Sequence, residues 1–292
     1  MPAVFVLVWS TGFVVAKYGL PYAPPLTFLS IRFALSLFCF LIWIKLARVS
    51  WPRGQQQWMH LAVSGVLIHA GYLGGVWMAI KAGMGSGLAS LMVGLQPILT
   101  ALWVSSMASN QGAEKVTLRQ WLGLALGLGG LVLVVSRKFQ STQEVTAFTL
   151  AAVTTALLSI TAGTLYQKRY VAPADVRGAN AVQIAAAFAV TLPLALFETE
   201  AINLTPQFIS ALAWSVLVLT LGGSSLLYLL IQRGAATAVT SLMYLVPPTT
   251  ALMAWLLFAE PITAVTVLGT AITALGVSLV VRAAKPATEP SK

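Results

Sequence analysis

Long stretches without any charged side chain constrain this chain more than any other feature of its sequence. Asp, Glu, Lys and Arg are all missing from residues 1–16, 61–80, 82–113, 145–167, 178–197, 201–232, 234–259 and 261–281. A helix needs about 20 apolar residues to cross a bilayer. Charged residues make up only 8% of the chain, against about 25% in soluble domains. The outside of this protein must therefore be apolar, as well as its core.

Membrane-spanning helices account for these stretches. Backbone polar groups in lipid must be bonded internally, which leaves helices or a closed barrel. Barrel strands alternate in polarity over about ten residues, whereas these runs are longer and uniformly apolar. We predict an all-α integral membrane protein with ten transmembrane helices at residues 2–20, 25–46, 58–80, 85–107, 119–136, 145–168, 178–197, 207–231, 236–258 and 262–282.

The positions of the basic residues predict the orientation of the chain. Its net charge is +10 at pH 7. With a cytoplasmic N-terminus, only Lys17, Lys81, Arg137 and Lys138 lie outside, Arg32 lies within a span, and the remaining Lys and Arg lie inside. Short cytoplasmic loops carry such an excess of Lys and Arg. We therefore expect both termini in the cytoplasm, a multi-pass protein of a bacterial-type inner (plasma) membrane, and no nucleic-acid partner.

The chain contains two copies of one unit. Residues 80–97 (IKAGMGSGLASLMVGLQP) match residues 231–248 (IQRGAATAVTSLMYLVPP) at an offset of 151, and the offset becomes 146 after the fourth span. Among the paired positions are Lys17 and Lys168, Arg32 and Gln183, and Glu114 and Glu260. We predict a first five-helix repeat at 1–140, a second at 141–285, and a polar tail at 286–292. Five helices is an odd number, so the copies are inverted, as in many carriers that work by alternating access.

Four segments carry a family resemblance. They read WSTGFVVAKYGLPYAPPLTFLSIRF, LQPILTAL, EKVTLRQWLG and YLVPPTTALMAWLLFAEPITAVTVLGTAITALGV. Together they resemble the EamA branch of the drug/metabolite transporter superfamily over nearly the whole chain. The resemblance implies a ten-helix inverted-repeat carrier that exports amino acids, aromatic ones among them, and other small metabolites. The segment SSMASNQGAEKVT departs from the family pattern, which runs directly into an L-G-E turn, so the shape of this loop stays open.

Aromatic and polar side chains within the spans predict a substrate cavity. Trp9 and Phe13 share one helical face, and His69 and Tyr72 share another. Polar groups at the centre of a span usually face the bundle interior, and pockets combine aromatic walls with a few polar groups. The predicted substrate-binding residues are Trp9, Phe13, His69, Tyr72, Met92, Gln96, Tyr166, Gln183, Tyr228 and Tyr244.

Several of these residue types have a second interpretation. His69 could bond only a neighbouring helix, and Trp77 and Trp103 are candidates for the aromatic belt at the membrane interface. Arg32 could receive a substrate carboxylate or could extend to the interface. A structural role is favoured for Arg32 because an arginine here belongs to the general family pattern. His60 lies near a membrane edge, and no role is expected for it.

Prolines and glycines recur at equivalent positions of both copies. Pro97, Pro247 and Pro248 fall inside predicted spans, where proline bends a helix. They are candidate gating hinges, with a static kink as the alternative. Small residues line one face of the fifth and the tenth span: Gly123, Gly127 and Gly130, and Gly269, Thr273 and Gly276. Because small residues allow close helix contact in lipid, we expect these two spans to pack together away from the substrate.

The positions of the acidic residues bear on energy coupling. All seven lie in loops, at helix ends or in the tail: Glu114, Glu144, Asp175, Glu198, Glu200, Glu260 and Glu289. Proton-driven exporters commonly use a buried carboxylate. Its absence favours uniport-like transport. The alternative is a proton-coupled multidrug or metabolite exporter that uses His69, since histidine titrates near neutrality. The single cysteine, Cys39, excludes an internal disulfide, and neither cofactor nor metal is expected.

Two other function classes fit less well. An intramembrane enzyme would need a motif such as Gly-x-Ser-Gly or HExxH, but residues 222–226 read GGSSL and no HExxH occurs. A channel is disfavoured by the inverted copies and the matched prolines. Without a deep carboxylate the cavity suits no organic cation, and without a basic cluster it suits no sugar phosphate. We expect a small-molecule substrate and the lipid bilayer as partners, and a monomer as the working unit.

Overall fold

The computed structural model describes residues 2–109, 118–141, 144–232 and 245–283, and every regular element in these ranges is a helix. Five helices are long and apolar enough to cross a membrane: Pro25–Leu46, Gln55–Lys81, Ala147–Tyr170, Val176–Ala195 and Pro206–Leu230. Shorter apolar helices cover Val4–Gly19, Ser86–Thr100, Trp121–Ser136, Val246–Phe258 and Ala264–Leu279. The expectation of an all-α fold with membrane-type helices is confirmed for the described residues.

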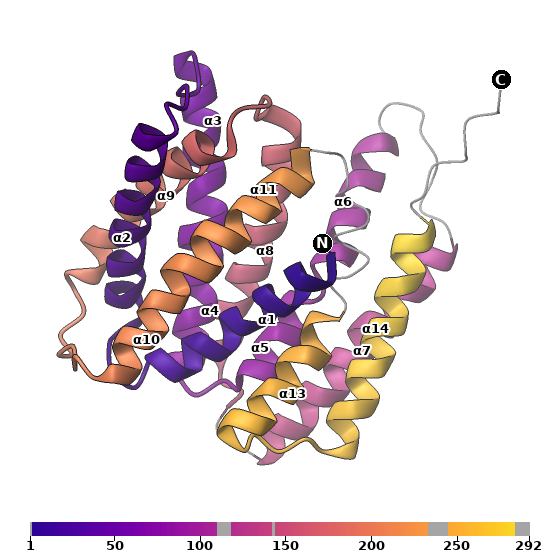
Figure 1. Ribbon diagram of the computed structural model, residues 1–292. Coiled ribbons are helices and arrows are strands. Elements are labelled where there is room, and N and C mark those ends of the chain that lie inside the picture. Colours follow the sequence, from indigo (N-terminus) through magenta and orange to yellow (C-terminus); the bar gives the residue numbers. More distant parts are fainter. Residues whose placement is uncertain (1, 110–117, 142–143, 233–244, 284–292) are drawn as a thin grey trace.

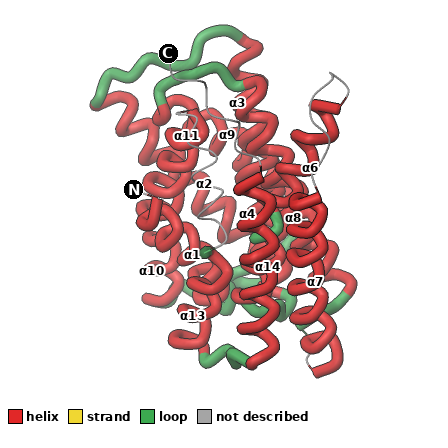
Figure 2. The backbone as a smooth tube through the Cα atoms, turned by 90° about the vertical axis from the view of Figure 1, so that its right-hand side faces the viewer, coloured by secondary structure: helices red, strands yellow, loops and turns green. Residues whose placement is uncertain are grey.

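The helices form one bundle, with the loops gathered at its two ends (Figures 1 and 2). Their order is α1 (Pro2–Gly19), α2 (Pro25–Leu46), α3 (Gln55–Gly65), η1 (Val66–Gly71), α4 (Tyr72–Lys81), α5 (Ser86–Val93), α6 (Gln96–Ser109), α7 (Leu118–Ser141), α8 (Ala147–Tyr170), α9 (Val176–Ala195), α10 (Pro206–Trp214), η2 (Ser215–Ser224), α11 (Ser225–Gln232), α13 (Val246–Phe258) and α14 (Ala264–Ala283). Loops 47–54 and 196–205 lie at opposite ends. The end that carries loops 20–24, 82–85, 196–205 and 259–263 is called the Glu260 end below.

Two of the long helices contain wide, π-helical turns. The segment η1 joins α3 to α4, and η2 joins α10 to α11. Moving η1 by the repeat offset of 151 residues gives 217–222, which lies inside η2. Such turns are rare and occur frequently at functional sites. The predicted spans 58–80 and 207–231 gave the extent of these helices correctly, but an apolar run carries no signal for the wider turn.

The expectation that Pro97 lies inside one continuous helix is wrong. The predicted span 85–107 consists of two helices, α5 and α6, separated at Gly94 and Leu95, and Pro97 stands in the first turn of α6. Pro247 and Pro248 likewise stand in the first turn of α13. Proline fits there because the first N–H groups of a helix have no partner within it. A hinge role for these prolines stays a prediction.

The helices α7 and α14 pack along each other, as the small-residue faces predicted, and lie side by side at one edge of the bundle (Figure 1). The two backbones approach closely at two points, where a Cβ atom on Gly130 would meet the carbonyl of Gly269 and one on Gly276 would meet the carbonyl of Gly123. The hydroxyl of Thr273 donates to the carbonyl of Gly127 over 3.3 Å. The pair is therefore held by backbone contact rather than by large interlocking side chains.

Candidate functional site

A small cavity of about 30 Å³ lies between α1, α2, α4 and the two wide turns. Its lining is Trp9, Gly12, Phe13, Arg32, Ile68, His69, Tyr72, Leu73, Val76, Trp77, Leu219 and Ser224. Four of the predicted substrate-binding residues meet here: Trp9 and Phe13 from α1, His69 from η1 and Tyr72 from α4. Residues from both copies contribute, because Leu219 and Ser224 come from η2.

Aromatic rings form one wall of this cavity. The ring of Trp9 stacks parallel to that of Tyr72, with centroids 6.1 Å apart and planes 2° apart. Trp77 packs against Phe28 at 4.5 Å and is only 1% exposed. The interfacial belt position considered for Trp77 is therefore wrong, because its helix turns it inward beside the cavity. Flat, rigid faces of this kind bind aromatic or apolar groups well.

Polar groups from α2 and the two wide turns line the same cavity. Arg32 of α2 is 4% exposed, and its Nε donates to Oγ1 of Thr220 over 3.0 Å. The Thr220 hydroxyl in turn donates to the carbonyl of Ser215 over 2.9 Å. His69 is buried, with its ring edge-on to Phe33. Arg32 therefore does not extend to the membrane interface; it joins α2 to η2 and lines the cavity.

Other predicted residues make contacts elsewhere. The Gln183 amide donates to Oγ of Ser64 and Oε1 of Gln167, each over 2.9 Å. The Gln96 amide donates to Oγ1 of Thr164 over 3.3 Å. Met92 is buried in the hydrophobic core. The described lining of the cavity includes none of these side chains, and a role for them in binding stays a prediction.

The predicted tyrosines are dispersed. The hydroxyl of Tyr166 lies 2.7 Å from Nδ1 of His60, and both rings contact Tyr170. His60, for which no role was expected, thus belongs to an aromatic cluster between α3 and α8. Tyr228 is buried in a small separate core with Leu61 and its neighbours. Tyr244 lies outside the described residues.

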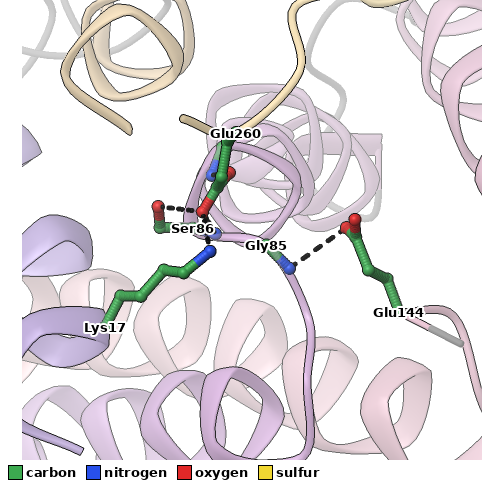
Figure 3. A network of polar contacts seen from close by, with 6 residues as sticks. Lys17, Gly85, Ser86, Glu144 and Glu260 are labelled. Carbon is green, nitrogen blue, oxygen red and sulfur yellow. Dashed lines mark hydrogen bonds and ion pairs between the residues drawn. The ribbon is translucent and has the colours of Figure 1, made fainter. Parts of the chain in front are cut away.

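A charged network at the Glu260 end was not predicted from the sequence (Figure 3). Oε1 of Glu260 accepts from Nζ of Lys17 over 2.6 Å, from the Ser86 N–H over 3.1 Å and from the Ser86 hydroxyl over 3.0 Å. Glu144 accepts from the N–H of Gly85 over 3.2 Å. Two carboxylates thus lie at the N-terminus of α5, where unpaired N–H groups and the helix dipole favour negative charge.

The network holds Glu260 ionised. Burial raises the pKa of its carboxyl, but the hydrogen bonds from Lys17 and Ser86 and the charge of Lys17 outweigh burial, so the pKa lies below its ordinary value of 4.5. Ala259, in the left-handed region at φ 52°, turns the chain at the end of α13 and brings Glu260 to this position. Three segments far apart in the sequence are joined as a result: α1, α5 and the α13–α14 loop.

The two halves of the chain both match one family model, that of the EamA-like transporter family, at residues 3–136 and 147–282. The chain belongs to the EamA-like transporter family. An uncharacterized transporter of Bacillus subtilis, YvbV, is 28% identical over 89% of this chain and 84% of its own length. A probable amino-acid metabolite efflux pump of Salmonella typhimurium is 30% identical over 44% of this chain and 40% of its own.

A solved crystal structure shares the fold, with a TM-score of 0.69, 16% sequence identity and coverage of 96% of this chain and 95% of that chain. The match to the family model confirms the family resemblance seen in the sequence. As a member of this family, the protein is a multi-pass membrane transporter.

The cavity makes a direct prediction for transport. Trp9→Ala is expected to weaken the apparent affinity for an aromatic solute about tenfold, because it removes the ring that stacks on Tyr72 and a large apolar contact area. Uptake into liposomes over a range of solute concentrations measures this. Trp121→Ala is the matched control, since Trp121 is 54% exposed on α7 and away from the cavity. An equal loss of apparent affinity in both variants would contradict the assignment of this cavity as the substrate site.

Proposed function

We propose that this EamA-like protein is a ten-span carrier that exports small neutral metabolites across a bacterial-type inner membrane, foremost amino acids with aromatic or other apolar side chains. One observation carries the proposal: a cavity whose wall is aromatic and whose few polar groups include Arg32 of α2 together with His69 and Ser224 of the two wide turns. The printed name of the Salmonella relative, a probable amino-acid metabolite efflux pump, supports the same solute class.

We propose alternating access as the mechanism, with the five-helix repeats 1–140 and 141–285 inverted and both termini in the cytoplasm. The repeat offset and the matched wide turns support this arrangement. The described acids Glu144, Glu198, Glu200 and Glu260 lie at the Glu260 end, which is the outer end in this orientation. There, Lys17–Glu260 and Lys81–Glu200 ion pairs join separate segments. The Lys17–Glu260 network would act as an outer latch that opens when solute leaves.

A liposome uptake panel tests the solute class. Purified protein is reconstituted and offered amino acids, nucleobases and cationic dyes. We expect saturable uptake of phenylalanine, tyrosine or other apolar amino acids, and exchange of labelled for unlabelled solute across the membrane, which separates a carrier from a pore. Uptake of the dyes alone would overturn the metabolite assignment.

Energy coupling is tested by the same vesicles with and without a pH gradient. Among the described acids none lines the cavity, so we expect uniport-like transport that the gradient leaves unchanged within about twofold. His69 does line the cavity and gives a second candidate mechanism. Strong acceleration by the gradient that disappears in His69→Ala would favour proton coupling and reverse this prediction.

A further inference from the structure

Arg32 is a cation inside the bundle, and some of its hydrogen-bond donors have no acceptor among the described residues. Its side chain is 4% exposed and lines the cavity. Only its Nε donates to another described side chain, the hydroxyl of Thr220. That single bond fixes one edge of the planar guanidinium, while Nη1 and Nη2 donate to no residue in the part of the chain that the structure describes. A guanidinium can donate two parallel hydrogen bonds to one carboxylate.

No described carboxylate balances this charge. Glu144, Glu198, Glu200 and Glu260 lie at the Glu260 end, and Asp175 pairs with Arg177 beside the opposite loops. Burying an unpaired cation is unfavourable, and intramembrane charges usually face a partner or a cavity that serves function. An anionic group that enters the cavity would supply the missing partner.

The second copy carries at the equivalent position a residue whose donors are fully used within the protein. Gln183 corresponds to Arg32 at the offset of 151, and its amide nitrogen uses both hydrogens, on Ser64 and on Gln167. A neutral amide with two partners is enough to join α9 to its neighbours. Arg32 instead brings a full charge and two further donor groups to the cavity, which the link to Thr220 alone does not need.

We propose that Arg32 receives the carboxylate of the transported solute, so that the cavity takes aryl carboxylates with or without an amino group. This inference rests on the proposed function and names its substrate class. The stacked rings of Trp9 and Tyr72 hold the aryl group, and Arg32 holds the carboxylate. The described lining contains no acid to pair with an ammonium group. The amino group of an amino acid should therefore add little to the affinity, and an aryl amine has no carboxylate for Arg32 to bind.

Three probes that differ by one group test the proposal on the wild-type protein: L-phenylalanine, 3-phenylpropionate and 2-phenylethylamine. Binding is followed by the tryptophan fluorescence of purified protein in detergent, to which Trp9 and Trp77 contribute. We expect 3-phenylpropionate to bind within about threefold of phenylalanine and phenylethylamine to bind at least about tenfold more weakly, because charge-assisted hydrogen bonds are the strong ones.

Variants then locate the anchor. Arg32→Gln is expected to weaken binding of both carboxylates at least about tenfold and to leave the weak binding of phenylethylamine unchanged. Arg32→Lys keeps the charge but loses the planar fork, so its affinity for the carboxylates should fall between the affinities of the wild-type protein and of Arg32→Gln. Arg169→Gln, an exposed charge at the end of α8, is the control. Size-exclusion profiles check that each variant folds. The comparison of the three probes is made on the wild-type protein, so it tests the proposal even if a variant does not fold.

The outcomes separate this inference from the proposed function. If phenylalanine is transported but phenylethylamine binds as tightly as 3-phenylpropionate, or Arg32→Gln binds carboxylates normally, the role of Arg32 is overturned and the export of amino acids stands. If none of the three probes binds to the wild-type protein, both proposals fail. A selective loss of carboxylate binding in Arg32→Gln supports both.

Discussion

Gly276→Leu is expected to abolish the packing of α14 on α7 and, with it, the recovery of folded protein. A Cβ atom at residue 276 would lie against the carbonyl oxygen of Gly123 and 2.5 Å from the nitrogen of Gly127. These are backbone atoms of the facing helix, which cannot move aside as a flexible side chain can. Overpacking of a tight core costs about 1–3 kcal/mol, and more where the backbone must shift. We therefore expect this substitution to lower the free energy of unfolding by more than about 3 kcal/mol.

Gly129→Leu is the matched control. It lies in the same helix pair, one residue before Gly130, but a Cβ atom there meets nothing within 4 Å and the position is exposed. Since glycine is a poor helix former, leucine at residue 129 should leave stability unchanged or slightly higher. Size-exclusion profiles and melting curves of the two variants in detergent make the comparison. Equal melting temperatures would show that the close contact of α7 and α14 does not support the fold.

Glu260→Gln is expected to release the outer latch. The substitution keeps the shape of the side chain but removes its charge, so Lys17 loses its partner at 2.6 Å and Ser86 loses a charged acceptor. Hydrogen bonds to a charged group contribute about 1.5–3 kcal/mol. We expect a value near the lower limit, because the side chain of Lys17 is 34% exposed and solvent screens the pair.

Two further variants show whether the latch acts through charge. Glu200→Gln removes the other ion pair at this end, in which the glutamate side chain is 59% exposed, and should cost less than about 1 kcal/mol. The exchange of Lys17 and Glu260 restores an ion pair but not the acceptor for Ser86, so it should recover only part of the loss. Thermal melts measure stability, and labelling of a cysteine introduced into loop 82–85 measures opening. If Glu260→Gln melts no lower than Glu200→Gln, the latch is not a major contact.

The same network predicts the direction of a pH effect. The pKa of Glu260 is lower in the folded protein than its ordinary value of 4.5. Its contribution to stability is therefore fully present at neutral pH and is lost as the pH falls through that lowered pKa. The melting temperature of the wild-type protein should fall further than that of Glu260→Gln between pH 7 and pH 4. Parallel curves of melting temperature against pH for the two proteins would contradict this.

Much of the fold could be predicted because lipid leaves few choices. The predicted span 25–46 coincides with α2, and the small-residue faces identified the pair α7 and α14. Charge-free length and close-packed glycines are properties of the local sequence. The break at Gly94 and Leu95 could not be predicted in the same way. Proline bends a helix interior or begins a new helix, and which of these occurs depends on how the neighbouring helices pack.

The candidate site was predicted only in part, for the same reason. Trp9, Phe13, His69 and Tyr72 share helical faces within the first copy, so spacing was enough to group them. Thr220 lies 188 residues from Arg32, and Glu260 lies 243 residues from Lys17. No local pattern joins such pairs. The internal repeat was the one signal that reached so far, since it pairs Arg32 with Gln183 and thereby invites the comparison of their partners.

The wide turns η1 and η2 make a change in helix length tolerable at one place and not at another. A π-helical turn holds more residues than an α-helical one, so a deletion of one residue between 66 and 71 would let this segment close into a regular helix while the flanking turns stay in place. The wide turn beside the cavity, which carries Ile68 and His69, would be lost. An insertion between 72 and 75 would instead rotate everything after it by about 100° about the helix axis, and Gly75 would no longer face the backbone of α8, which it now meets at Ala152. Natural changes in length should therefore collect in the loops, and both wide turns should persist wherever this transport chemistry is kept.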